Sequence, residues 1–98
     1  EVDGFNIVRA IASRVVDPKR IIMRDAKSYC AILLDDNNRK TIARLHFNSP
    51  TVRYLGTFSG KDEKREPVGE TIDIYKHEVA ILKRIEELAS QKGAQDAV

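Results

Sequence analysis

Hydrophobic residues recur at a helical spacing near both ends of the chain and alternate with polar residues between them. Near the start, apolar positions return every three or four residues, which is typical of one face of an α-helix. These positions are Phe5, Val8, Ile11, Ala12 and Val15. Asp3 is a candidate N-cap. Pro18 restricts the residue before it, so we expect this helix to end near Val16.

A second helical pattern begins at Thr71. Its apolar stripe is expected to comprise Ile72, Tyr75, Val79, Leu82, Ile85 and Leu88, widened by Ile74 and Ile81. Gly93 is a plausible end of this helix because glycine favours the position just after a helix. Residues 94–98 are expected to form a flexible tail.

Four stretches between the helices read as strands: "RIIMRD", "SYCAILLD", "RKTIARLHFN" and "TVRYLGTF". The polar stretch "SGKDEKREPVGE" is expected to be a mobile loop. The pattern predicts one α+β domain over residues 1–93. It would contain an antiparallel three- to four-stranded sheet, with the N- and C-terminal helices packed on one face.

The two faces of the central hairpin can be sorted by residue parity. A two-residue turn at Asn37-Asn38 is expected because asparagine tolerates positive φ. Ile32 then faces Ala43, and Cys30 faces Leu45, on an apolar face that the helices cover. Cys30 is therefore expected to be a small buried hydrophobic residue.

The same parity gives the opposite face a basic and aromatic character. If Leu45 opposes Tyr54 on the next strand, then Val52, Tyr54 and Phe58 join the core face and Arg53 joins the other. A one-residue slip would bury arginines, which is costly unless they are paired. The outer face then collects Lys27, Tyr29, Arg44, His46 and Arg53, with an apolar patch of Leu33, Ile42 and Leu55.

Composition places limits on the class of protein. The 98 residues are 42% hydrophobic and 33% charged, as in a globular domain. The longest apolar run, "CAILL", is too short to span a bilayer. The chain starts without an apolar signal segment and without Met, so we expect a fragment of a longer chain. One cysteine and two distant histidines predict no disulfide, metal site or cofactor, and suggest a cytoplasmic location.

Charge is unevenly distributed along the chain. The net charge is +2, but residues 9–53 hold ten Lys or Arg against four Asp or Glu, a local excess of +6. A basic region of this kind favours a polyanionic partner, although an ordinary solvated surface would look the same. The apolar patch favours an alternative, a self-association or docking module without nucleic-acid binding.

A catalytic alternative rests on "RDAK". Asp25 and Lys27 have the spacing of half of a Mg²⁺-dependent nuclease site, with Asp17 or Asp35 as a possible second carboxylate. This three-residue spacing often occurs by chance, and Asp17 precedes Pro18 in a loop. We therefore expect no catalytic residue within this chain.

A longer stretch carries a family resemblance. The segment "RDAKSYCAILLDDNNRKTIARLHFN", followed by "YLGTF", resembles the C-terminal module of bacterial and phage proteins related to the N-terminal, nuclease-like region of type I restriction enzyme R subunits. The resemblance runs roughly from Phe5 to Tyr75. It implies a cytoplasmic prokaryotic protein tied to DNA, in which a Mg²⁺-dependent endonuclease domain upstream does any cutting.

The expected function is therefore that of a non-catalytic accessory module that contacts DNA through its basic sheet face. Possible partners are DNA, the upstream nuclease-like domain and a second copy of the chain. The candidate nucleic-acid-binding residues are Arg24, Lys27, Tyr29, Arg39, Lys40, Arg44, His46 and Arg53.

Overall fold

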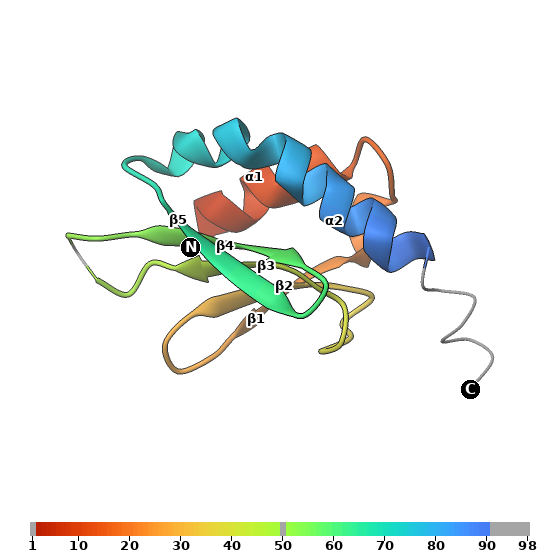
Figure 1. The fold of residues 1–98 in the computed structure, drawn as a ribbon, viewed down its shortest axis with the longest axis horizontal. Helices are drawn as coiled ribbons and strands as arrows, with labels where there is room; N and C mark the ends of the chain where they lie inside the picture. Colours follow the sequence, from red (N-terminus) through yellow and green to blue (C-terminus); the bar gives the residue numbers. More distant parts are fainter. Residues whose placement is uncertain (1, 50, 91–98) are drawn as a thin grey trace.

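Two helices lie across one face of a five-stranded antiparallel sheet (Figure 1). The computed structural model describes residues 2–49 and 51–90. The strands follow the chain in simple order, β1-β2-β3-β4-β5. The elements are α1 (Val2–Ala12), η1 (Pro18–Arg20), β1 (Ile21–Asp25), β2 (Cys30–Leu34), β3 (Thr41–His46), β4 (Tyr54–Ser59), β5 (Asp62–Pro67), η2 (Thr71–His77) and α2 (Glu78–Ser90). The predicted α+β class is confirmed, with one strand more than expected.

Helix α1 packs closely on the centre of the sheet. Val8, Ile11 and Ala12 are buried, and a Cβ added at Gly4 would lie 2.9 Å from Leu45 Cδ1. Glycine therefore lets the helix backbone approach the Leu45 side chain on β3 without any shift of that side chain. The helix ends at Ala12, earlier than expected, so Val15 lies beyond it and is exposed rather than in the core.

The C-terminal helix starts with a 3-10 segment, η2, and continues as α2. Its buried side chains include Ile74, Ile81, Ile85 and Leu88, whereas the predicted core positions Ile72, Tyr75 and Val79 are exposed. The predicted stripe advanced by three residues at most steps, so it winds around a helix of 3.6 residues per turn. Gly93 and residues 94–98 lie outside the described residues.

The register of β2 and β3 matches the prediction over three pairs: Cys30 with Leu45, Ala31 with Arg44, and Ile32 with Ala43. Cys30 is buried, as expected. The turn differs from the prediction, because the left-handed residues are Asp35 (φ 58°) and Asp36 (φ 55°) instead of two asparagines. A bulge follows, and it pairs Leu33 with Thr41.

Two contacts hold Asp35 in its unusual conformation. The Arg20 guanidinium donates two hydrogen bonds of 2.7 Å to the Asp35 carboxylate. The Asp35 backbone N–H donates to the Arg20 carbonyl oxygen at 2.8 Å. The hydrogen bond with Asp35 raises the pKa of Arg20. This two-point pairing explains how an aspartate, instead of the predicted asparagine, occupies the first left-handed position.

The β3–β4 pairing is shifted by one residue from the prediction. Leu45 faces Leu55, and His46 faces Tyr54. Leu55 therefore joins the core, while Tyr54 moves to the uncovered face, where its hydroxyl can reach water. The predicted apolar patch of Leu33, Ile42 and Leu55 is wrong, because each of these residues is at most 2% exposed.

The stretch expected to be a mobile loop contains β5. It pairs with β4 along its whole length, from Ser59 with Asp62 to Tyr54 with Pro67. The hairpin turns at Gly60, whose φ of 61° suits glycine. As an edge strand made of charged residues and ending in proline, β5 is poorly suited to pair with another chain.

Candidate nucleic-acid interface

The face of the sheet turned away from the helices, called the open face here, carries a transverse row of three arginines. The strand registers align Arg24 on β1, Arg44 on β3 and Arg65 on β5. The small residues Ala31 and Gly56 stand between them on β2 and β4. Neighbouring strands lie about 4.8 Å apart, so consecutive arginines of the row are anchored about 10 Å apart.

An aromatic row lies beside the arginine row. The rings of Tyr29 and His46 have centroids 5.7 Å apart, and His46 faces Tyr54 across β3 and β4. The β1–β2 turn and the β3–β4 loop meet at this end of the sheet (Figure 1), where Asn48 Nδ2 donates to the Lys27 carbonyl oxygen at 3.3 Å. The exposed Lys27 is therefore placed beside the aromatic row.

One carboxylate organises the centre of the open face. Glu63 on β5 accepts a hydrogen bond from Arg44 Nη1 at 3.3 Å and lies 2.6 Å from His46 Nε2. The same carboxylate lies 3.9 Å from Arg65 Nε. A Cβ at Gly56 would collide with Glu63, so the glycine leaves the path across β4 by which Glu63 reaches β3.

Two rings hold the guanidinium of Arg44. Its Cζ lies 4.5 Å from the centroid of Tyr29 and 5.2 Å from that of Phe58. Its Nε is buried and has no hydrogen-bond partner among the described residues. Stacking on rings fixes the position of a guanidinium without using its donors. Arg44 therefore keeps hydrogen-bonding capacity beyond its contact with Glu63.

The structure brings together some of the predicted site residues. Tyr29, Arg44 and His46 form one cluster on the open face. Arg24 is on the same face, and its guanidinium pairs with Asp36 at 3.0 Å. Arg39 is exposed in the turn between β2 and β3.

Two predicted site residues are placed differently. Lys40, which directly precedes β3, is only 5% exposed and does not present an open cation. Arg53 has the core-facing parity after the shift of β4, and its guanidinium lies 5.7 Å from the ring of Phe47, which packs against the core. Both are corrections to the predicted binding surface.

Four residues of the open face were missed: Tyr54, Phe58, Glu63 and Arg65. Tyr54 and Phe58 were assigned to the core because of the register error. Glu63 and Arg65 lie in the run 62–66, in which every residue is charged and neither hydrophobicity nor the sign of charge alternates. Gly60 was the turn signal ahead of this run, and the polarity of the run favoured a loop.

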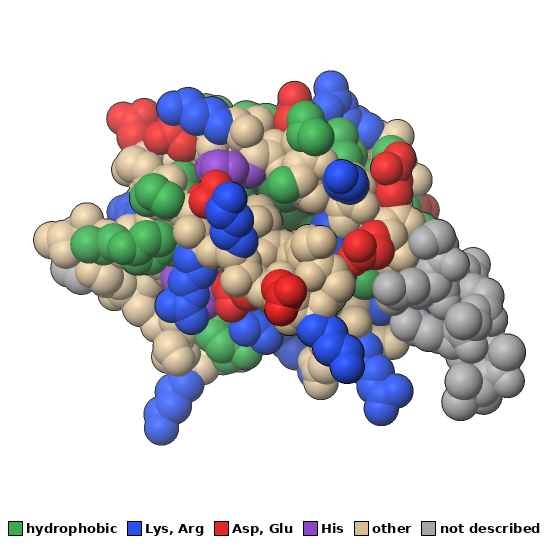
Figure 2. All heavy atoms as spheres, in the orientation of Figure 1, with side chains coloured by type: hydrophobic (Ala, Val, Ile, Leu, Met, Phe, Trp, Pro, Cys, Tyr) green, Lys and Arg blue, Asp and Glu red, His purple; other side chains and the backbone are tan. Residues whose placement is uncertain are grey.

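A shallow hollow of about 340 Å³ opens beside the aromatic row. It is lined by Ser28, Tyr29, His46, Asn48, Ser49, Val52, Tyr54 and Arg65. Lys and Arg side chains project from the lower margin of the molecule in Figure 2, on the sheet side of this view. An aromatic hollow with cations around it can accept a planar ring that carries a nearby anionic group.

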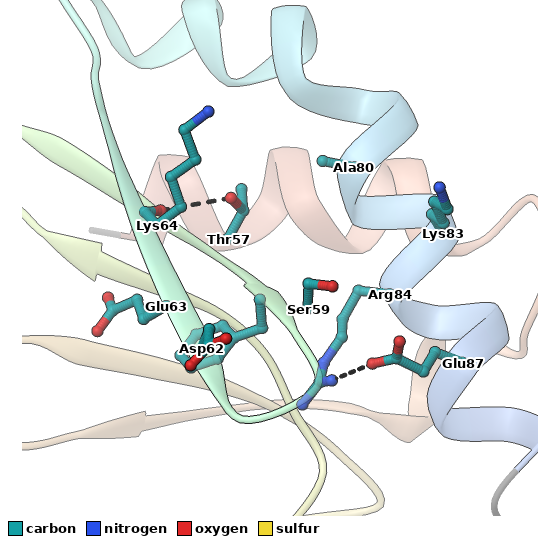
Figure 3. Close-up of a pocket in the computed structure, with 10 residues that line it drawn as sticks. Thr57, Ser59, Asp62, Glu63, Lys64, Ala80, Lys83, Arg84 and Glu87 are labelled. Carbon is teal, nitrogen blue, oxygen red and sulfur yellow. Dashed lines mark hydrogen bonds and ion pairs between the residues drawn. The ribbon is translucent and has the colours of Figure 1, made fainter.

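A second hollow, of about 290 Å³, separates the β4–β5 hairpin from α2 (Figure 3). Arg84 extends from α2 into this corner and is only 6% exposed. It donates to the carbonyl oxygens of Thr41 at 2.9 Å and Gly60 at 3.0 Å, and it pairs with Glu87. Its donors are directed at the protein's own backbone, so this corner is structural.

Glu87 closes the same corner. Its carboxylate accepts a hydrogen bond from the Gly60 backbone N–H at 3.2 Å. This bond, together with the Arg84 guanidinium, lowers the pKa of Glu87 below its ordinary value. The ionised carboxylate therefore helps to attach the β4–β5 turn to α2.

The two carboxylates considered as partners of Asp25 in catalysis have other roles. Asp17 caps η1 by accepting from the Lys19 N–H, and Asp35 pairs with Arg20. Among residues 2–49 and 51–90, no group of three or more His, Cys, Asp or Glu side chains could hold a metal ion. The helices in these same ranges are all too short or too polar to cross a membrane.

Comparisons with known protein families, with curated proteins and with solved structures found no significant match.

Proposed function

We propose that the open face of the sheet binds nucleic acid, as the contact surface of a non-catalytic accessory module in a cytoplasmic, restriction-endonuclease-like protein. The observation that carries this proposal is the row of Arg24, Arg44 and Arg65 across β1, β3 and β5. Cations in a row on an uncovered sheet match the repeated negative charges of a phosphate backbone.

Glu63 limits the positive charge at the centre of the open face. With one carboxylate near two arginines and a histidine, the centre of the face keeps a positive excess smaller than its arginines alone would give. Such a surface favours moderate, salt-sensitive binding without sequence preference. An accessory contact that supports a separate nuclease domain needs affinity of this kind.

The first test removes two exposed cations at the ends of the row. Arg24→Ala with Arg65→Ala should lower affinity for any DNA sequence about ten-fold or more and reduce the salt dependence of binding, because phosphate contacts release counterions. Lys76→Ala with Lys83→Ala is the matched control, since it removes the same charge from the helix layer. Fluorescence anisotropy, recorded from low salt upward, measures the affinity and its salt dependence for each double variant. Equal losses in the two double variants, or no binding by the wild type, would refute the proposal.

A second candidate function is self-association through the helix layer. Ile72, Tyr75 and Val79 form an exposed apolar stripe along η2 and α2, and Val79 is 74% exposed. This stripe takes the place of the patch expected on the sheet. Sedimentation velocity across a range of concentrations should then show dimers that Val79→Asp abolishes. A constant monomer mass would remove this candidate.

A further inference from the structure

We infer that the hollow beside Tyr29 and Tyr54 binds an unpaired nucleobase, so that the open face prefers single-stranded nucleic acid to duplex. This inference rests on the proposed function and deepens it by naming the ligand class.

The shape of the open face favours a single strand over a duplex. The major groove of a duplex is read by an α-helix or a two-stranded ribbon that protrudes into it. Here the helices cover the opposite face of the sheet (Figure 1). The open face presents a hollow in place of a projecting element. A base inside a duplex is stacked on both sides and cannot enter such a hollow, whereas a base turned out of a single strand can.

Two tyrosine rings line the hollow, and neighbouring side chains hold one of them in place. Tyr54 is 36% exposed at the side of the hollow, and Tyr29 is half-buried at the same site. The Arg44 guanidinium stacks over Tyr29 and the tilted ring of His46 lies beside it, so the orientation of Tyr29 is fixed before any ligand arrives. Pre-positioned rings lower the entropy cost of stacking a base.

Short polar side chains also line the hollow: Ser28, Asn48 and Ser49. Hydrogen bonds hold two of them in place. Asn48 donates to the Lys27 carbonyl oxygen, and Ser49 Oγ accepts from the backbone N–H of Val52 at 3.2 Å. Short polar groups at fixed positions can hydrogen-bond the edge of an unpaired base.

Cations stand where the flanking phosphates of such a base would lie. Arg65 lines the hollow, and its side chain is 60% exposed. Lys27 precedes Ser28 in the β1–β2 turn and is exposed. The volume of about 340 Å³ lies near the lower end of the ~300–1,000 Å³ typical of ligand sites, which suits one nucleotide-sized group.

The test compares a labelled single-stranded oligonucleotide with a duplex of the same sequence at one low salt concentration. The wild type should bind the single strand about ten-fold more tightly, and Tyr54→Ala should remove most of that difference. Tyr54→Phe should keep it, because the ring is retained. Tyr75→Ala is the matched control: Tyr75 is a similarly exposed tyrosine, 41% exposed, on the helix layer.

The outcomes separate the inference from the proposed function. If duplex binds as tightly as single strand, or if Tyr54→Ala weakens both equally, the inference fails while the proposed function stands. If neither nucleic acid binds at low salt, both fail.

A second measurement needs only the wild-type protein. Photo-cross-linking of a 5-bromouracil single strand, followed by mass spectrometry, should place the adduct on Tyr29 or Tyr54. Adducts confined to other residues would overturn the inference.

Discussion

Two arginines beside Phe58 differ in their hydrogen-bond partners. The Cζ of Arg84, on α2, lies 5.5 Å from the ring centroid, and that of Arg44, on β3, lies 5.2 Å from it. Arg84 is almost fully buried, and its donors meet backbone carbonyls. Arg44 is partly exposed, stacks on two rings and donates to Glu63. The hydrogen-bond partners of an arginine, more than its burial, distinguish one that stabilises the fold from one that is available for binding.

The extent of the pairing between β3 and β4 explains the difference between the two arginines. The pairing of β3 and β4 ends at Ala43 with Thr57, and beyond it the two strands diverge. The divergence leaves the Thr41 carbonyl without a strand partner on β4, and Arg84 supplies the missing donor. At Arg44 the strands remain paired, so their backbone groups need no side chain. The following predictions test this contrast.

The largest expected effect is that of Arg84→Ala, which should lower the free energy of unfolding by about 3 kcal/mol, because two backbone carbonyls lose their arginine donor and Glu87 loses its cation. Arg84→Met keeps the apolar length and should lose nearly as much. Urea denaturation measures both. The exposed neighbour Lys83→Ala should change stability by only about 0.5 kcal/mol. A similar effect for all three variants would contradict the structural role of Arg84.

Arg44→Ala should instead act on binding. We expect nucleic-acid affinity to fall about ten-fold and the salt slope to decrease by about one, with stability lowered by only about 1 kcal/mol. Arg9→Ala is the matched control, because Arg9 also stacks on a ring, that of Phe5, but lies on α1. Binding titrations over a range of salt give both values. An unchanged slope would show that Arg44 makes no phosphate contact.

Glu63→Gln should have the opposite sign. Removing the negative charge between Arg44 and Arg65 should raise affinity about three-fold, since the Coulomb repulsion of a nearby phosphate disappears. Glu66→Gln removes the same charge from the opposite side of β5, where Glu66 pairs with Leu55. It should change affinity less. Weaker binding by Glu63→Gln would mean that Glu63 positions the arginines more than it competes for them.

The smallest effect concerns pH. The pKa of Glu87 is lowered in the folded protein by the Gly60 N–H and then by Arg84. Its contribution to stability is therefore complete above the ordinary glutamate pKa and is lost as the pH falls through the lowered value. Thermal melts of wild type and Glu87→Gln should differ at pH 7 and converge as the pH falls below the lowered pKa of Glu87. Glu86→Gln controls for the charge. A constant difference would contradict this role.

The registers of two consecutive hairpins differed in how far they could be predicted from sequence. The β2–β3 register followed from alternation, because Arg44 and Leu45 differ sharply in the cost of burial. At β4, Tyr54 and Leu55 are both apolar neighbours, so either could have been placed in the core. The length of the preceding loop decided between them, and the sequence did not determine it.

The same limit applies to the candidate site. Tyr29, Arg44 and His46 lie on one hairpin, so parity alone grouped them. Glu63 and Arg65 join them only through β5, which has no apolar residue from Asp62 to Glu66 to mark it as a strand. An edge strand can be entirely charged because solvent covers it, and hydrophobic pattern is blind to such strands.

Arg84 also links the helix layer to the strand that carries two charges of the open face. By binding the Gly60 carbonyl it anchors the tip of the hairpin whose second strand carries Glu63 and Arg65. The α2 helix, whose Arg84 also lies beside the ring of Phe58, thus helps to set where those two charges stand. Substitutions in α2 should therefore change the ligand affinity proposed for the far face of the sheet.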